Sequence, residues 1–519
     1  MKNLIIKSII CLATGVPVVT SAHTIGQFDM HSYECSAIIN RHTNSVSSDN
    51  SLTMYPKLIE DYGLLEEQPF TAFNLRDKRI STRSDSKDSE FMHATLSESG
   101  TLASIVGDRL LELDSISVEG PMNDDDFNTL WESSFNGHLK VINLENAIIE
   151  NGKIPDYALF HIDEQVDWSN FDIYTIWLEK IILPEGITEI GDFALAYATT
   201  LTDVNFPSTL KDIGTSAFTD CFRMPSENFV LNDGLEKIGK QAFYQCHGLT
   251  EKIVLPQSLK EIWCGAFYRC EITEINIPEN LEFLGCFAFA GSKFKTAILP
   301  DDCYLCPEGC QFYNNWELTE AHLPDNSLFV PPAIFDSCIL LSKVNVPSKT
   351  ITIGEFAYNL TAISQIDFPA TLETIGQDAF QRCSKLESVV LPPSIKRIGD
   401  RAFAIYELKN IYCMATVPPE CPPSPDSSES EGAPFPDVDP AIPVYIPIGT
   451  KQQYMSAPGW DHLTNFIETE NFPYSGIENI QVDVTPQDEC IYDPYGRKVN
   501  RLMPGNLYIC NGKKFILTD

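Results

Sequence analysis

The sequence predicts a parallel β-solenoid that carries a small β unit at its C-terminal end. A short motif recurs every 22 to 25 residues from about residue 180 onward. Each copy opens with alternating apolar residues, the pattern of a strand with one buried face, and a proline usually follows. One repeat of this length cannot bury its apolar side alone, so successive repeats must stack as rungs. We therefore expect a parallel β-sheet on one face of the solenoid and short irregular or helical turns on the other.

The motif is clearest in the rung that follows Pro369. Counted from that proline, Leu372 is third, Ile375–Gly376 are sixth and seventh, and Ala379–Phe380 are tenth and eleventh. The other copies largely keep this order, and five of the ten have cysteine at the fourteenth position. The ten residues that follow the strands are Pro184, Pro207, Asn232, Pro256, Pro278, Pro300, Pro324, Pro347, Pro369 and Pro392.

These repeats resemble the BspA-type leucine-rich repeat proteins of surface-associated bacteria. The runs that carry the resemblance are Leu210–Cys221, Leu235–Cys246 and Leu372–Cys383. It covers residues 180–417, and residues 91–179 resemble the irregular first repeats, or cap, of such proteins. The resemblance implies a leucine-rich repeat solenoid and a role in adhesion to host matrix proteins or to other bacteria. It leaves the ligand open.

Composition limits the partners of this chain of 519 residues. Its 72 acidic and 36 basic residues give a formal net charge of -36. A surface of that sign repels nucleic acid and anionic lipid headgroups, so we expect no nucleic-acid partner. After the first residues, no stretch reaches the roughly 18 consecutive apolar residues of a membrane helix, so no transmembrane segment is expected.

The N-terminal end has the pattern of an export signal. Residues 1–22 begin with Lys2 and Lys7, continue with an apolar run and end in Ser21-Ala22. We therefore expect an exported protein that is secreted or associated with the cell surface or outer membrane. Residues 23–90 show no repeat and contain polar stretches, which predicts a partly ordered N-terminal region.

Three segments follow the repeats. Residues 418–443 hold nine prolines and no Lys or Arg, which predicts an extended, solvated insertion. The resemblance to BspA-type proteins implies that residues 444–470 close the solenoid with a strand and a short helix. Residues 476–519 are predicted to be a small β domain, because Asn511-Gly512 between strand-like runs signals a hairpin. This domain resembles C-terminal domains of exported Bacteroidetes proteins, some of which act as sorting signals.

Motifs for catalysis and cofactor binding are missing from the sequence. It has no Gly-x-Ser-x-Gly, His-Glu-x-x-His, Walker-type or Gly-x-Gly-x-x-Gly motif, so no catalytic residue and no cofactor is expected. The run Cys303-x2-Cys306-x3-Cys310 has spacing that suggests a metal site. Counted from Pro300, however, these cysteines take positions three, six and ten, which elsewhere hold core residues, so we expect apolar filling and no metal. Asp124–Asp126 are expected to start a helix or form an acidic loop rather than bind calcium.

The remaining cysteines predict two different situations. Cys264 and Cys286 take the same position, otherwise mostly polar, in adjacent rungs, so a disulfide between them is possible. Cys490 and Cys510 are a similar candidate pair in the C-terminal β domain. The cysteines at the fourteenth position should instead form a column of buried thiols: Cys221, Cys246, Cys270, Cys338 and Cys383.

The outward face of the sheet is the predicted binding surface, because alternate strand residues form a regular ladder there. Asn205, Asn276 and Asn345 offer hydrogen bonds to a peptide or glycan, and Val254, Ile298 and Val390 offer apolar contact. Each of these residues has a plain alternative as a solvated strand residue. The polar candidates are Asp203, Asn205, Lys252, Glu274, Asn276, Glu320, His322, Lys343, Asn345, Gln365 and Asp367.

The function that follows from the sequence is therefore binding rather than catalysis. We expect an exported adhesion protein that recognises a host or microbial surface protein through the sheet face. The first alternative is a surface glycan-binding protein, which exposed aromatic residues on that face would favour. A catalytic site within residues 23–90 is a further alternative, but the segment is short and polar.

Overall fold

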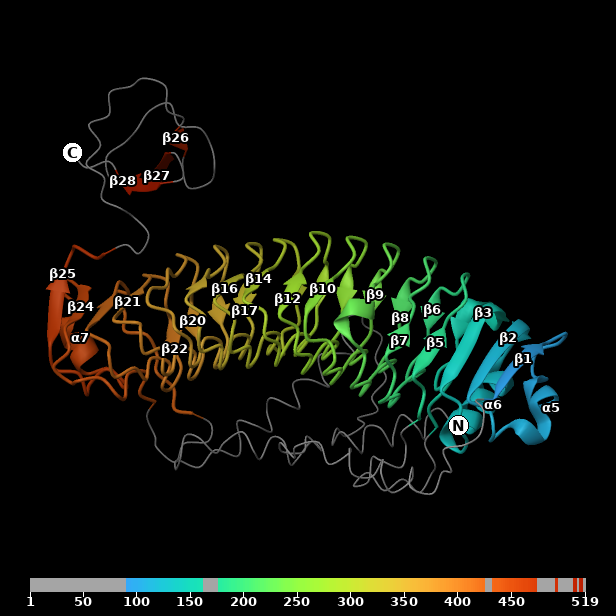
Figure 1. Ribbon diagram of the computed structural model, residues 1–519. Coiled ribbons are helices and arrows are strands. Elements are labelled where there is room, and N and C mark those ends of the chain that lie inside the picture. The colour runs from blue at the N-terminus through green and yellow to red at the C-terminus, as the bar shows by residue number, and fades with distance from the viewer. Residues whose placement is uncertain are drawn as a thin grey trace, which may run out of the picture.

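The computed structural model describes residues 90–161, 176–424 and 432–473, and short strands at 491–492, 507–510 and 513–516. The predicted export signal and almost all of the predicted N-terminal region lie outside these residues. The described repeats stack into one elongated solenoid, in which each rung is one circuit of the chain (Figure 1). Among the described helices, none has the length and apolar character needed to cross a membrane.

The first sheet is the predicted one, formed by the strands that precede the repeat prolines. Its strands are parallel and form several hydrogen-bonded groups along the stack. Within a group each strand pairs with the strand of the next rung, as Lys252–Val254 does with Glu274–Asn276. Alternate residues point inward, so Ile253 is buried while Lys252 and Val254 are exposed. The strands within the repeats are β5 (Lys180–Ile182), β7 (Asp203–Val204), β10 (Lys252–Val254), β12 (Glu274–Asn276), β14 (Thr296–Ile298), β16 (Glu320–His322), β18 (Lys343–Val344), β21 (Ser388–Leu391) and β23 (Asn410–Cys413).

A second parallel sheet runs beside the first, where the sequence predicts only irregular or helical turns. Its strands have two residues each and end on the inward Ile, Leu or Val that usually precedes the repeat glycine. Two residues are too few to show an alternating pattern, which is why the sequence does not reveal them. Within residues 176–424 the described helix content is one 3-10 turn, η4 (Ser226–Asn228). The strands are β4 (Lys153–Ile154), β6 (Glu189–Ile190), β8 (Asp212–Ile213), β9 (Lys237–Ile238), β11 (Glu261–Ile262), β13 (Phe283–Leu284), β15 (Tyr304–Leu305), β17 (Phe329–Val330), β19 (Thr352–Ile353), β20 (Thr374–Ile375) and β22 (Arg397–Ile398).

A column of stacked aromatic rings, here called the aromatic spine, fills the centre of the solenoid. Neighbouring ring centroids lie 5.1 to 6.1 Å apart, and every ring is at most 1% exposed. This spacing suits offset stacking of aromatic rings on strands about 4.8 Å apart. The spine consists of Phe218, Phe243, Phe267, Phe289, Phe312, Phe335, Tyr358, Phe380, Phe403 and Phe435.

The last ring corrects one expectation from the sequence. Residues 418–443 were expected to be an extended, solvated insertion, yet Phe435 is fully buried and stacks on Phe403 at 5.3 Å. Cys421, Val438 and Ile442 in the same segment are also buried. The described parts of this segment, 418–424 and 432–443, pack on the solenoid and supply the next ring of the spine, which the proline content does not reveal.

The cysteines at the fourteenth position form the predicted buried column. Cys221, Cys246, Cys270, Cys338 and Cys383 are all fully buried thiols. Each thiol donates a hydrogen bond to a backbone carbonyl of the preceding rung, at 3.1 to 3.4 Å. Burial raises the pKa of Cys383 to about 11, so this thiol stays protonated at neutral pH. These cysteines are structural fillers that also satisfy a carbonyl.

Backbone hydrogen bonds join the rungs in both directions along the stack. Backbone N–H groups in and next to the strands donate to the preceding rung, as Gly239 N does to Ile213 O at 2.7 Å. Backbone N–H groups in the turns after the second-sheet strands donate to the following rung, as Phe218 N does to Ala242 O at 2.8 Å. The glycine that follows most second-sheet strands allows this close approach, since a Cβ on Gly376 would lie 2.5 Å from Glu355 N.

Three asparagines at the ends of first-sheet strands hold the preceding rung by both groups of the side-chain amide. Leu255 N donates to Asn276 Oδ1 at 2.8 Å, and Asn276 Nδ2 donates to Leu255 O at 2.8 Å. Asn205 makes the same pair of bonds to Leu183, and Asn345 makes them to Leu323. We call this contact the asparagine clip. It continues the hydrogen-bond ladder with a side chain at the point where strand pairing ends.

The N-terminal end adds longer strands to the first sheet. β1 (Phe91–Thr95), β2 (Ser115–Met122) and β3 (Val141–Ile149) pair in parallel and lead into β5. Helix α6 (Asp124–Phe135) packs on this end and begins with the three aspartates, as expected. Buried Asp126 accepts hydrogen bonds from the backbone of Gly100 and Leu102, so it serves the fold. The short helices are α5 (Leu102–Val106), η1 (Gly107–Arg109) and η2 (Glu150–Gly152).

The C-terminal end closes the solenoid with β24 (Val444–Pro447), α7 (Lys451–Met455) and β25 (Phe466–Thr469). Trp460 is fully buried, contacts the last spine ring, Phe435, at 5.5 Å, and packs against Tyr454 at 5.1 Å. The spine therefore ends under a cap of large side chains.

The C-terminal β unit contains three antiparallel strands: β26 (Ile491–Tyr492), β27 (Leu507–Cys510) and β28 (Lys513–Ile516). Asn511-Gly512 connects β27 to β28, which confirms the predicted hairpin. Cys490 lies outside the described residues, so its predicted pairing with Cys510 stays a prediction.

The aromatic spine generates the first testable prediction. Phe380→Ala should lower the free energy of unfolding by about 3 to 5 kcal/mol, because it opens a cavity between Tyr358 and Phe403. Urea denaturation followed by circular dichroism measures the change. The control is Tyr406→Ala, since Tyr406 is 75% exposed and should change stability by less than about 0.5 kcal/mol. Equal effects of the two variants would show that the spine does not stabilise the stack.

The asparagine clip generates the second testable prediction. Asn276→Ala should destabilise the protein by about 1 to 3 kcal/mol and speed amide hydrogen exchange at Leu255, because both backbone groups lose their partner. The matched control is Asp367→Ala, which changes an exposed residue at the same strand position. Hydrogen exchange read by mass spectrometry separates the two, and unchanged protection around Leu255 would contradict the clip.

Candidate ligand-binding surface

The three asparagines predicted to bind a ligand have a structural role instead. In Asn205, Asn276 and Asn345 both the oxygen and the nitrogen of the amide bond the backbone of the preceding rung. The expectation that they bind a peptide or glycan is therefore corrected. They face outward as predicted. Each side-chain amide, however, is already hydrogen-bonded to backbone groups of the preceding rung, at the point where the pairing of the two strands ends.

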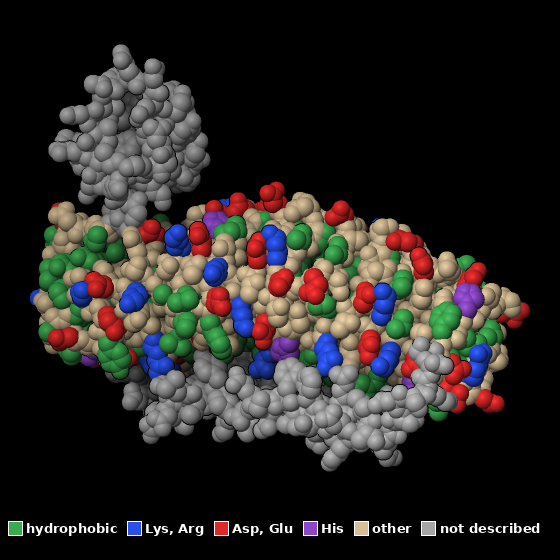
Figure 2. All heavy atoms as spheres, in the orientation of Figure 1, with side chains coloured by type: hydrophobic (Ala, Val, Ile, Leu, Met, Phe, Trp, Pro, Cys, Tyr) green, Lys and Arg blue, Asp and Glu red, His purple; other side chains and the backbone are tan. Residues whose placement is uncertain are grey.

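The charged candidates on the first-sheet face pair with one another across adjacent rungs. Asp203 lies 2.5 Å from Lys180, Lys252 pairs with Glu274, and Lys343 lies 3.7 Å from Glu320. These pairs are exposed, so each contributes only about 0 to 1 kcal/mol to stability. Acidic and basic side chains also intermingle on the face shown in Figure 2. The face therefore shows alternating charge rather than one strong field.

His322, Gln365 and Asp367 complete the predicted polar set. His322 is on β16 and points outward, with its Nε2 3.9 Å from Asp301 Oδ1 and 3.8 Å from Asp325 Oδ1. Gln365 and Asp367 are both exposed on the rung that ends at Pro369, two rungs farther along. These three are the predicted polar residues that neither form a clip nor pair with a lysine.

Apolar residues also appear on the outer face of the first sheet. Val230, Val254 and Ile298 are 71%, 59% and 50% exposed. Toward the C-terminal end, Tyr412 and Tyr445 stack in parallel with centroids 4.4 Å apart. This tyrosine pair was not predicted, because the outward-facing residues proposed from the sequence end at Val390, one strand before Tyr412.

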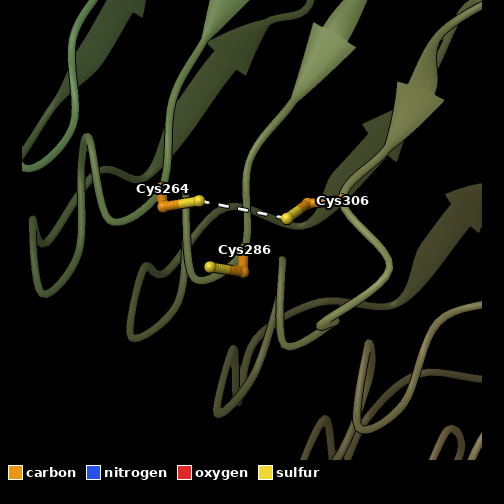
Figure 3. Close-up of side chains that lie close together, drawn as sticks. All are labelled: Cys264, Cys286 and Cys306. Carbon is orange, nitrogen blue, oxygen red and sulfur yellow. Dashed lines mark hydrogen bonds between the residues drawn. The ribbon is translucent and has the colours of Figure 1, made fainter. Parts of the chain in front are cut away.

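The predicted disulfide between Cys264 and Cys286 is absent, and a third cysteine lies beside them. The Sγ atoms of Cys264 and Cys306 are 4.0 Å apart and point toward each other (Figure 3). All three Sγ atoms lie within 4.8 Å of one another, beyond the roughly 2.05 Å of a disulfide bond. We call Cys264, Cys286 and Cys306 the thiol cluster.

The position of Cys306 corrects the expectation for Cys303, Cys306 and Cys310. Cys303 does fill the core as expected. Cys306 follows the second-sheet strand at the place that Gly285 takes one rung earlier, since both nitrogens donate to the preceding strand's last carbonyl. Cys310 has φ +61°, and buried Gln311 takes the usual alanine place. This rung has one residue fewer before the strand and two more after it, so counting from the proline misplaces two cysteines.

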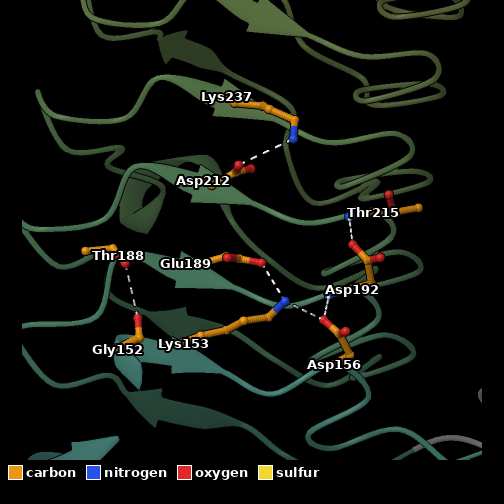
Figure 4. A network of polar contacts seen from close by, with 9 residues as sticks. All are labelled: Gly152, Lys153, Asp156, Thr188, Glu189, Asp192, Asp212, Thr215 and Lys237. Carbon is orange, nitrogen blue, oxygen red and sulfur yellow. Dashed lines mark hydrogen bonds and ion pairs between the residues drawn. The ribbon is translucent and has the colours of Figure 1, made fainter. Parts of the chain in front are cut away.

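The outer face of the second sheet is polar over its first rungs. Lys153 Nζ contacts Glu189 at 2.6 Å and Asp156 at 3.0 Å, and Asp192 accepts from Thr215 N at 2.7 Å (Figure 4). Burial opposes the charge of Lys153, but the two carboxylates outweigh it and raise the pKa of this lysine. The polar groups of this region therefore satisfy each other.

Farther along the same face, four aromatic side chains replace the polar groups. Phe283 lies 5.1 Å from Trp263 and 6.3 Å from Tyr304, and Tyr304 lies 6.4 Å from Phe329. We call these four residues the aromatic strip. Tyr304 is 50% exposed and the other three are partly exposed.

Charged and apolar neighbours border the aromatic strip. Lys237 lies over the Trp263 ring at 5.9 Å, and Trp263 Nε1 donates to Glu261 at 2.8 Å. At the other end, Leu328 is 56% exposed and Ile351 is 41% exposed. The strip was not predicted from the sequence, because the two-residue strands of the second sheet, on or next to which these aromatic residues lie, were not predicted. The signal is present as an aromatic residue before or after the inward Ile, Leu or Val of four consecutive rungs.

Comparison with known proteins agrees with this architecture. Residues 169–418 match the BspA type Leucine rich repeat region, in six copies over 169–295, 236–327 and 308–418. No curated protein matches the chain.

Several solved structures also match. A leucine-rich repeat protein from Bacteroides ovatus is 23% identical, with 58% of this chain and 82% of that chain covered and a TM-score of 0.39. A leucine rich cell surface protein from Faecalibacterium prausnitzii is 19% identical, with 64% and 84% covered and a TM-score of 0.35. The pneumococcal vaccine antigen PcpA is 16% identical, with 69% and 80% covered and a TM-score of 0.34. The repeats of residues 169–418 are thus of the BspA-type leucine-rich repeat kind, as the match to that family's model shows.

Proposed function

We propose that this protein is an exported, non-enzymatic adhesion protein that binds a host or microbial surface protein through the outer faces of its solenoid. The observation that carries the proposal is the aromatic strip. Trp and Tyr side chains dominate the binding energy of protein interfaces, and rings on adjacent rungs form a continuous apolar contact. Exposed Leu328 and Ile351 extend that contact.

The charges around the strip favour a protein partner. Lys237 and Glu261 border one end of the strip. On the neighbouring rung, acidic and basic side chains form ion pairs, such as Lys237 with Asp212. A polar rim around an aromatic centre is the usual composition of a protein interface. On the first-sheet face, His322, Gln365 and Asp367 remain the predicted residues that a ligand would contact.

Glycan binding is the second candidate, and the tyrosine pair favours it. Tyr412 and Tyr445 present two parallel, partly exposed rings on the first-sheet face. Exposed aromatic residues on this face are the feature that distinguishes a glycan-binding surface from the charged ladder. The two candidate functions therefore depend on different residues and can be separated by mutation.

Export and anchoring complete the proposal. Residues 1–22 would direct export, and residues 476–519 would be a terminal β domain that acts in sorting or surface attachment. The sequence lacks the catalytic motifs named above, so binding rather than turnover is the proposed activity.

The proposal predicts that Tyr304→Ala and Phe329→Ala together weaken protein binding about 30-fold or more, because the variant loses two neighbouring anchors. The chain from residue 23 to 519 is tested on immobilised host matrix proteins, bacterial surface proteins and purified glycans, with dissociation constants from biolayer interferometry. Tyr406→Ala, which removes an exposed tyrosine outside the strip, is the control and should bind like the wild type.

Two results would overturn protein adhesion through the strip. One is saturable protein binding that the double variant leaves unchanged. The other is binding to glycans alone that Tyr412→Ala and Tyr445→Ala abolish, which would establish the second candidate instead.

A further inference from the structure

The thiol cluster brings three sulfur atoms together beside the aromatic strip, and a buried carboxylate contacts one of them. The Cys264 and Cys306 Sγ atoms lie 4.0 Å apart, and Cys286 Sγ lies within 4.8 Å of both. Glu308 is only 5% exposed, and its Oε2 accepts a hydrogen bond from Cys306 Sγ at 2.8 Å. Three sulfur atoms from three consecutive rungs therefore converge, and the Glu308 carboxylate lies next to one of them.

The main hydrophobic core does not include these three cysteines. Cys264 and Cys286 occupy the column that other rungs fill with Thr215, Glu355 or Gln377, outside the apolar core. Together with Cys306 they form a separate small cluster, against which Phe283 and Phe287 pack. By contrast, the fourteenth-position thiols each fill the core and bond a carbonyl.

The irregular rung gives a second, independent observation. One residue fewer before β15 places Cys306, rather than glycine, next to Cys286. Two extra residues after it form the loop that brings buried Glu308 to the Cys306 sulfur.

The distances suit a tetrahedral metal ion. With Zn–S bonds of about 2.3 Å, two sulfurs on one zinc ion lie about 3.8 Å apart. The 4.0 Å between Cys264 and Cys306 needs only a small change, and the 4.8 Å limit is within reach of side-chain rotation. Three thiolates and one carboxylate are ligand types that zinc accepts.

A disulfide across the cluster fits the geometry less well. Cys264 and Cys306 have the facing sulfurs, but they lie two rungs apart, about 9.6 Å at about 4.8 Å per rung. A disulfide requires Cα atoms about 4.4 to 6.8 Å apart. Cys264 and Cys286 are on adjacent rungs, but such a bond would leave Cys306 and Glu308 without a role.

We propose that Cys264, Cys286, Cys306 and Glu308 form a binding site for one zinc ion. The metal would tie three consecutive rungs together beneath the aromatic strip, because Phe283 contacts both the cluster and the strip. Zinc binding requires deprotonated thiols, so affinity should fall as the pH is lowered. This inference is independent of the adhesion proposal and needs no ligand for the solenoid face.

The test uses zinc and cobalt ions on the chain from residue 23 to 519, purified with reductant and treated with a chelator. Competition with a chromophoric chelator should show one zinc ion per chain. Cobalt should give the thiolate charge-transfer band and the intense visible bands of a tetrahedral site. Cys264→Ser and Cys306→Ser should each weaken zinc binding roughly 100-fold. Glu308→Gln should weaken it about tenfold and alter the cobalt spectrum.

Cys310→Ser is the matched control, since Cys310 is in the same rung but outside the cluster, and it should bind zinc like the wild type. Circular dichroism confirms that each variant is folded. Should a variant misfold, the stoichiometry and cobalt spectrum of the wild type still decide. Absence of zinc binding by the reduced wild type would overturn the proposal. So would wild-type affinity in the Cys264 and Cys306 variants, or a Cys264–Cys286 disulfide in protein purified without reductant and containing no zinc.

Discussion

The stacking of one buried aromatic ring per rung is the interaction on which the rest of this structure depends. The rings of the aromatic spine repeat at 5.1 to 6.1 Å, which fixes how each rung is placed on the last. Backbone groups then find partners in both neighbours, backward from the strands and forward from the turns. Surface features such as the aromatic strip are periodic because the core beneath them is periodic.

The sequence was sufficient to predict the solenoid and its first sheet. Alternation before a proline shows a strand with one buried face, and Asn511-Gly512 shows a hairpin, because both signals are local. The second sheet was beyond reach, since two-residue strands have no period. Burial of Phe435 was also hidden, because a proline-rich segment gives no local sign that it supplies a ring to a distant core.

The candidate site was harder to predict for a physical reason. Alternation tells which residues face outward, but it does not tell whether their polar atoms already have partners. Asn205, Asn276 and Asn345 face outward, yet each is used where strand pairing ends. A signal does exist in retrospect: each stands in Asn-x-Pro, one rung after a Leu-Pro pair. The position of Cys306 could be found only from the structure. Its rung has a deletion before the strand and an insertion after it, so counting residues from the proline does not give the right position.

The capped end of the spine has a consequence for how molecules meet. A stack of identical rungs would present an open ring and unpaired strand at its last member, ready to accept the first rung of another chain. Here Trp460 and Tyr454 cover Phe435, and β25 completes the first sheet beyond β24. The last ring of the spine is therefore not available to the first ring of another chain, although β25 is still the edge strand of its sheet among the described residues.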